Sequence, residues 1–108
     1  MNTDQIKEIV ETYRRHGWNL TGYVKNAGGT DIRFDDFPEG IGGVPVTPGL
    51  VDAAWFSRDS GRDNLALELR LLSTQPIALF ESIPLDTNNK EIQNIRLEME
   101  SRLSQMAA

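Results

Sequence analysis

Residues 64–72, Asn-Leu-Ala-Leu-Glu-Leu-Arg-Leu-Leu, carry the most regular pattern in this chain. Leucine occupies every second position from residue 65 to residue 71, and alanine, glutamate and arginine fill the positions between. This alternation is typical of a β-strand that turns one face to the core. The stretch therefore predicts a central strand in which Leu67 and Leu69 are almost fully buried.

Two further apolar runs flank this strand, at residues 50–57 and 77–83. The segments between them, 58–63 and 73–76, are rich in turn-forming residues, so the three runs are expected to form an antiparallel meander. The second hairpin has two readings, because Ile77 and Leu79 compete with Ala78 and Phe80 for the buried side. The sequence leaves that choice open.

The first hairpin has a preferred register. Val51, Ala53 and Trp55 must share the leucine face, and pairing Trp55 with Leu67 achieves this. A slip by one residue would turn a carboxylate toward the core, which is costly without a partner. The expected register places Asp52 opposite Arg70 on the solvated face, as an exposed cross-strand charge pair.

Helical spacing of apolar residues predicts one helix over residues 4–16 and another that starts near residues 86–88. A half-buried strand is expected at residues 18–24, directly after Gly17. The apolar stripe of the second helix consists of Ile92, Ile95, Met99, Leu103 and Met106. We therefore expect an α+β fold, a two-layer sandwich with an N-terminal helix, a mostly antiparallel sheet of four to five strands and a C-terminal helix. Both helices are expected to cover the leucine face.

Residues 37–49 contain four glycines and three prolines in thirteen positions. So many breakers predict a long loop without regular structure. Loops of this length inside compact domains are usually functional or mobile. We expect residues 37–49 to be the most mobile internal segment, or a plain connection.

The composition restricts the class of protein. A chain of 108 residues fits a single domain, and the absence of cysteine removes disulfides and thiolate metal sites. The net charge of −5 disfavours nucleic-acid binding, because the DNA or RNA backbone is itself negative. No apolar run is long enough to span a membrane and the N-terminus has no secretory pattern, so a cytoplasmic location is expected.

Few residues suggest catalysis or a bound cofactor. The only histidine, His16, is expected at the end of the first helix, so a serine-histidine triad is not predicted. Four acidic residues near the long loop match no calcium-binding spacing: Asp31, Asp35, Asp36 and Glu39. We therefore expect neither a metal ion nor a cofactor.

One group of residues offers an alternative. In the expected register, Asp52 on one strand lies on the same face as Glu68 and Arg70 on the next strand. Two carboxylates beside a cation could hold a divalent ion for phosphodiester cleavage. The arrangement resembles the PD-D/ExK nuclease superfamily, with Arg70 where that family has lysine. The resemblance implies a metal-dependent phosphodiesterase with these three residues as its catalytic group.

The leading interpretation is a small noncatalytic binding domain. If both helices cover the leucine face, the opposite face of the sheet is open, and Ala54, Phe56 and Phe80 make it partly apolar. Such a face would suit a protein partner or a second copy of the chain. The long loop is the other candidate for a binding site.

Overall fold

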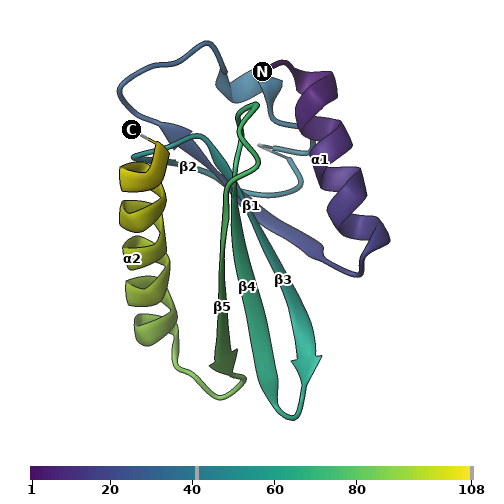
Figure 1. The fold of residues 1–108 in the computed structure, drawn as a ribbon, viewed down its shortest axis with the longest axis vertical. Coiled ribbons are helices and arrows are strands. Elements are labelled where there is room, and N and C mark those ends of the chain that lie inside the picture. Colours follow the sequence, from purple (N-terminus) through teal and green to yellow (C-terminus); the bar gives the residue numbers. More distant parts are fainter. Residues whose placement is uncertain (41, 108) are drawn as a thin grey trace.

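The computed structural model describes residues 1–40 and 42–107, which form a five-stranded sheet with one helix on each side (Figure 1). The sheet order is β2-β1-β3-β4-β5, with β1 and β2 parallel and all other neighbours antiparallel. The expected α+β fold, with a helix at each end of the chain and a mostly antiparallel sheet, is confirmed. The elements are α1 (Thr3–Arg15), β1 (Asn19–Asn26), the 3-10 helix η1 (Phe34–Asp36), β2 (Val46–Gly49), β3 (Ala53–Gly61), β4 (Asn64–Leu71), β5 (Ala78–Pro84) and α2 (Asn89–Ala107).

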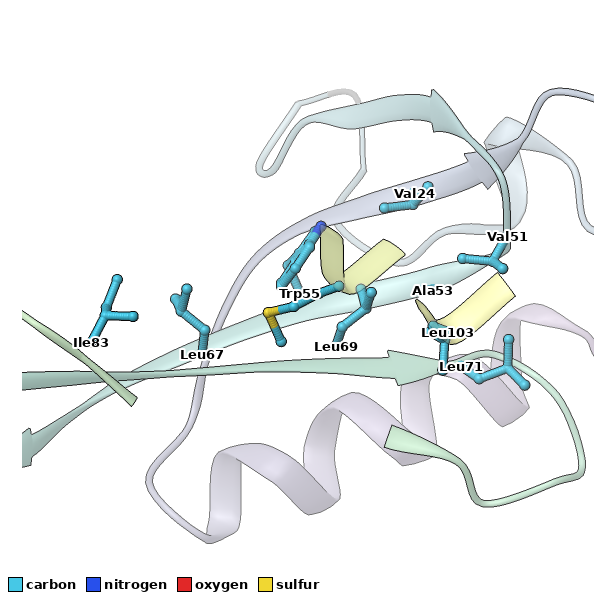
Figure 2. Packing of buried hydrophobic residues seen from close by; sticks show 10 residues of the cluster. Val24, Val51, Ala53, Trp55, Leu67, Leu69, Leu71, Ile83 and Leu103 are labelled. Atoms are coloured by element: carbon cyan, nitrogen blue, oxygen red, sulfur yellow. The ribbon is translucent and has the colours of Figure 1, made fainter. Parts of the chain in front are cut away.

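The leucine face of the sheet is covered by α2. Leu67 and Leu69 are 1% and 0% exposed, as expected, and they pack in one cluster with Met99 and Leu103 of α2. Figure 2 shows Trp55 of β3 beside Leu69 in this cluster. In residues 1–40 and 42–107, no helix combines the length and apolar character needed to cross a bilayer.

The opposite face is covered in part by α1, so the expectation that both helices share the leucine face is wrong. Ile6 and Val10 of α1 pack in a second cluster with Tyr23, Ala54 and Phe56. These three sheet residues form an apolar surface of their own, and burying it stabilises the fold in the same way as burying leucine does. The sandwich therefore has a helix layer on each side of the sheet.

Both helices begin at an asparagine cap. The side chain of Asn2 accepts a hydrogen bond from the backbone of Gln5, whose side chain accepts from the backbone of Asn2 in return. At α2 the backbone N–H of Glu91 donates to the side-chain oxygen of Asn88 at 2.9 Å. Reciprocal caps satisfy N–H groups that the first helical turn leaves free. The two helices begin at Thr3 and Asn89, close to the starts expected at residue 4 and near residues 86–88.

The first hairpin differs from the expected register by two residues. Trp55 pairs with Leu69, not with Leu67, because β3 continues to Gly61 and the turn is made by Arg62 and Asp63. Both turn residues have positive φ, 53° and 62°, as a type I′ turn requires.

A bulge at residue 60 keeps the leucines and Trp55 on one face. A two-residue turn alone would pair Trp55 with Arg70, and every leucine of β4 would then face away from Trp55. The register shifts by one between Asp59 and Gly61. One extra residue on one strand restores the common face.

A second bulge divides β1 between the two cores. Leu20 pairs with Phe56 and packs toward α1, whereas Gly22 pairs with Trp55 and Val24 packs toward α2. The register shift between residues 20 and 22 reverses the alternation that the sequence suggested for residues 18–24.

Part of the long loop is regular, which corrects the expectation for residues 37–49. Its end forms β2, which pairs in parallel with β1 at the edge of the sheet. The sequence did not predict this strand, because proline argues against a strand unless the strand lies at the edge of a sheet, and β2 contains Pro48. Phe37, at the other end of the loop, is buried in the α1 cluster. Residue 41 of this loop lies outside the described residues.

Candidate functional site

The three residues of the nuclease-like hypothesis do not come together. Glu68 lies opposite Phe56, and Arg70 lies opposite Ala54. Asp52 lies just before β3 and level with Leu72. The backbone N–H of Leu72 donates to the Asp52 carbonyl at 2.8 Å. Asp52 is therefore four positions along the sheet from Glu68, about 13 Å at roughly 3.3 Å per residue. The two-residue change in register thus separates the carboxylates that a shared metal ion would need.

Asp52 instead belongs to a buried polar cluster at the end of β1. Its carboxylate accepts the backbone N–H of Asn26 at 2.8 Å and the hydroxyl of Thr30 at 2.6 Å. The Lys25 ammonium lies 3.7 Å from Asp52 Oδ1 and donates to the Asn26 carbonyl at 3.0 Å. Lys25 and Asp52 are only 6% and 8% exposed. The expected exposed pair of Asp52 with Arg70 is therefore wrong, because the partner of Asp52 is Lys25.

Three of the four acidic residues near the long loop, Asp31, Asp36 and Glu39, have separate partners. Asp31 accepts from the N-terminal amino group at 3.2 Å, which holds the pKa of its carboxyl below the usual range. Asp36 accepts from the backbone N–H of Arg33 at 2.7 Å, and Glu39 pairs with Arg14 at 2.6 Å. Within residues 1–40 and 42–107, no three histidine or acidic side chains gather as a set of metal ligands.

The apolar residues expected on an open face have different exposures. Ala54 and Phe56 are 0% exposed because α1 lies over them. The ring of Tyr13 stacks on Phe56 with centroids 4.0 Å apart and planes 9° apart. Phe80, by contrast, is 55% exposed. Of the three candidates, only Phe80 is available at the surface.

The open part of this face is a strip along β4 and β5, which we name the β4–β5 strip. In the second hairpin, Ile77 and Leu79 pack on the α2 side, which settles the choice that the sequence left open. The residues between them turn toward the α1 side. The strip consists of Glu68, Arg70, Ala78, Phe80 and Ser82.

Aromatic side chains link the strip to α1. The ring of Trp18 meets Phe80 edge to face, with centroids 6.3 Å apart, and contacts Tyr13 at 6.2 Å. The guanidinium of Arg58 lies over the Trp18 ring at 4.7 Å. Trp18 was not predicted as part of a surface site, because its position is typical of an ordinary strand residue.

Tyr13 remains protonated at the border of the strip. Burial raises the pKa of its phenol far above the usual range, and the neighbouring Glu68 carboxylate adds to the rise. The guanidinium of Arg70 donates to the carbonyl of Leu71 and, at 3.4 Å, to that of Gln75.

The free edge of β5 is the second part of the site. Leu71 donates its N–H to the carbonyl of Ile77 at 2.9 Å. Antiparallel partners exchange two backbone hydrogen bonds at every second residue. The residues of β5 whose backbone groups point toward β4 are therefore Leu79, Glu81 and Ile83. The backbone groups of Ala78, Phe80 and Ser82 therefore point away from β4. Figure 1 shows β5 between the two helices with neither helix crossing it.

The opposite edge of the sheet is less open to a further strand. There β2 has only four residues and contains Pro48, which has no backbone N–H to donate. Short strands and prolines are common ways to block pairing at an edge. The two edges of this sheet are therefore unequal, and β5 is the better template for strand addition.

The fold and the strip together describe a small α+β domain whose β5 edge is the better placed of its two sheet edges to pair with a further strand. No protein-family model, no curated protein and no solved structure matches this chain.

Proposed function

We propose that this domain binds another polypeptide at the β5 edge and the adjoining β4–β5 strip, and that it acts as an interaction domain without catalysing a reaction. One observation carries the proposal. Phe80 is 55% exposed in the middle of a strand whose outward backbone groups have no partner among residues 1–40 and 42–107.

Strand addition explains how both features could be used. An extended segment pairs with an exposed edge through main-chain hydrogen bonds, and its alternate side chains contact the face of the sheet. Here those side chains would meet Phe80 and the ring of Trp18, with Arg58 beside them. Aromatic and arginine side chains are enriched in the centres of protein interfaces.

The chemistry of the site also describes the segment that would fit. It is an extended strand with an apolar side chain where it meets Phe80 and small side chains two positions away. It needs free N–H groups opposite Ala78, Phe80 and Ser82, so proline at those positions excludes it. Binding of such a segment would bury the half-exposed Phe80 ring, and burying an aromatic side chain favours association.

Selection of peptides tests the proposal directly. A library of random displayed peptides is selected on the domain, and each selected peptide is then measured on Phe80→Ser. Leu97→Ser is the matched control, because Leu97 is 58% exposed and lies on α2, outside the site. We expect peptides whose affinity falls at least about tenfold in Phe80→Ser and is unchanged in Leu97→Ser.

Amide exchange then locates the bound peptide. Added peptide should slow exchange at the outward amides of Ala78, Phe80 and Ser82. Peptides that bind equally well to Phe80→Ser, or that protect β2 and leave β5 unprotected, would refute the proposed site.

A further inference from the structure

We infer that the polypeptide that pairs with β5 is a second copy of this chain, joined by two-fold antiparallel pairing of the two β5 strands centred on Phe80. This inference rests on the proposed function and names its partner. The register of the free β5 edge, the side chains on each face of β5 and the short, proline-containing β2 edge all favour this partner.

The backbone groups of the free edge are self-complementary. The outward residues are Ala78, Phe80 and Ser82, evenly spaced about the middle one. In a two-fold pair centred on Phe80, Ala78 meets Ser82 of the second copy and Phe80 meets its own equivalent. Each such pair exchanges two N–H···O bonds. Every outward donor and acceptor of the three residues is then satisfied.

The neighbouring registers are worse because of two prolines. Centring the pair on Leu79 places Ser82 opposite Pro76, and centring it on Glu81 places Ala78 opposite Pro84. Proline has no N–H, so in each of these registers one outward carbonyl of each copy, that of Ser82 or of Ala78, loses its donor. Centring on Glu81 also sets two glutamates directly opposite, which is destabilising.

The side chains favour the register centred on Phe80. On the strip side, two Phe80 rings lie together, with the small side chains of Ala78 and Ser82 beside them. On the other side, Leu79 lies opposite Glu81 of the second copy, so no like charges are directly paired. An isologous contact of this kind joins the same patch on both copies and closes after two.

The other edge of the sheet favours a closed dimer. If both edges accepted strands, copies would add in a row and form a fibre. The short β2 strand, with Pro48 within it, makes growth at that edge unfavourable. Each copy carries a net charge of −5, so mutual repulsion weakens the dimer at low ionic strength and added salt should strengthen it.

Cysteine cross-linking tests the register, because the natural chain has no cysteine. Hydrogen-bonded antiparallel pairs have Cα atoms about 5.5 Å apart, within the range for a disulfide. A mixture of Ala78→Cys and Ser82→Cys, both of which keep Phe80, should form a mixed disulfide dimer under mild oxidation. Ala78→Cys alone is the matched control, because its two thiols would lie about 14 Å apart, at roughly 3.4 Å per residue.

Sedimentation across a concentration series provides the second measurement. The unmodified chain should form dimers, and Phe80→Asp should raise the dimer dissociation constant at least about tenfold. Leu97→Asp, at an exposed position outside β5, should leave that constant unchanged. Equal cross-linking of Ala78→Cys alone and of the mixture would overturn the register.

The outcomes separate this inference from the proposed function. A chain that stays monomeric while peptides bind in a Phe80-dependent way would overturn the second copy as partner and leave the interaction domain standing. A dimer that forms equally well in Phe80→Asp would overturn the pairing at β5. If peptide binding also fails to depend on Phe80, the proposed function fails with it.

Discussion

The two faces of the sheet differ in both composition and coverage. The face under α2 is aliphatic, and it is closed by Met99 and Leu103 over Leu67 and Leu69. The face under α1 contains stacked aromatic rings, a buried ion pair and an uncovered strip around Phe80. The α2 face is therefore a closed apolar core, whereas the α1 face combines a core with structural polar contacts and the surface available for binding.

The largest effect is expected on the α2 face. Leu69→Ala removes a fully buried side chain and leaves a cavity, so it should lower the free energy of unfolding by about 2 to 5 kcal/mol. Leu97→Ala is the matched control, and its exposed position should keep the change near 0.5 kcal/mol or less. Urea denaturation measures both. A loss below about 1 kcal/mol for Leu69→Ala would contradict the central place of β4.

A somewhat smaller effect is expected at the buried ion pair of the α1 face. Asp52→Asn leaves the Lys25 ammonium buried without its counter-charge, which should cost about 2 to 4 kcal/mol. Lys25→Met and the double variant complete a double-mutant cycle. Because the double variant leaves no uncompensated charge, its loss should be smaller than the sum of the two single losses. Additive losses would show that the two charges do not interact.

This comparison also explains which parts of the fold could be predicted from the sequence. The alternation of residues 64–72 depends only on the two-residue period of a strand, so the burial of Leu67 and Leu69 could be predicted. Helix ends depend on local capping chemistry and were placed within one or two residues. The register of the first hairpin depends on a bulge and on positive φ at Arg62 and Asp63. The residue types at these positions predict neither the bulge nor the positive φ values.

The candidate site was harder to predict because it depends on contacts between distant segments. No local pattern tells which face of a sheet a helix will cover, so Ala54 and Phe56 were expected at the surface and are buried. The burial of Lys25 depends on partners from the loop and from residue 52, far along the chain. Phe80 could be predicted as a candidate from the sequence. Its contact with Trp18 could not, because it depends on how α1 and the residues after it pack on the sheet.

Phe80 should contribute little to the stability of the monomer. Phe80→Ser removes a half-exposed ring and one edge-to-face contact with Trp18, so the free energy of unfolding should fall by about 1 kcal/mol or less. Thermal denaturation at increasing protein concentration sharpens the contrast. Association stabilises the native state, so Tm of the unmodified chain should rise with concentration and Tm of Phe80→Ser should not. Equal concentration dependence in both would contradict a stabilising contact at this residue.

The smallest effect is expected at Glu100, a half-buried carboxylate of α2 near the end of β2. Burial raises the pKa of the Glu100 carboxyl, and the charge of Arg96 offsets part of that rise. A carboxyl with a raised pKa in the folded state stabilises the fold most at pH values below its pKa in the unfolded chain, about 4.3. That contribution is lost as the pH rises through the higher pKa of the folded state.

Glu100→Gln should therefore stabilise the domain at pH 7, by about 0.5 kcal/mol or less given the partial exposure. The gain should shrink at pH 4, where the natural side chain is largely protonated. Glu98→Gln, at an exposed position of the same helix, is the control and should show no gain at pH 7. A loss of stability in Glu100→Gln at pH 7 would mean that the ionised carboxylate is favourably paired, and the α2 side of the molecule would then resemble the α1 side in containing a stabilising buried charge.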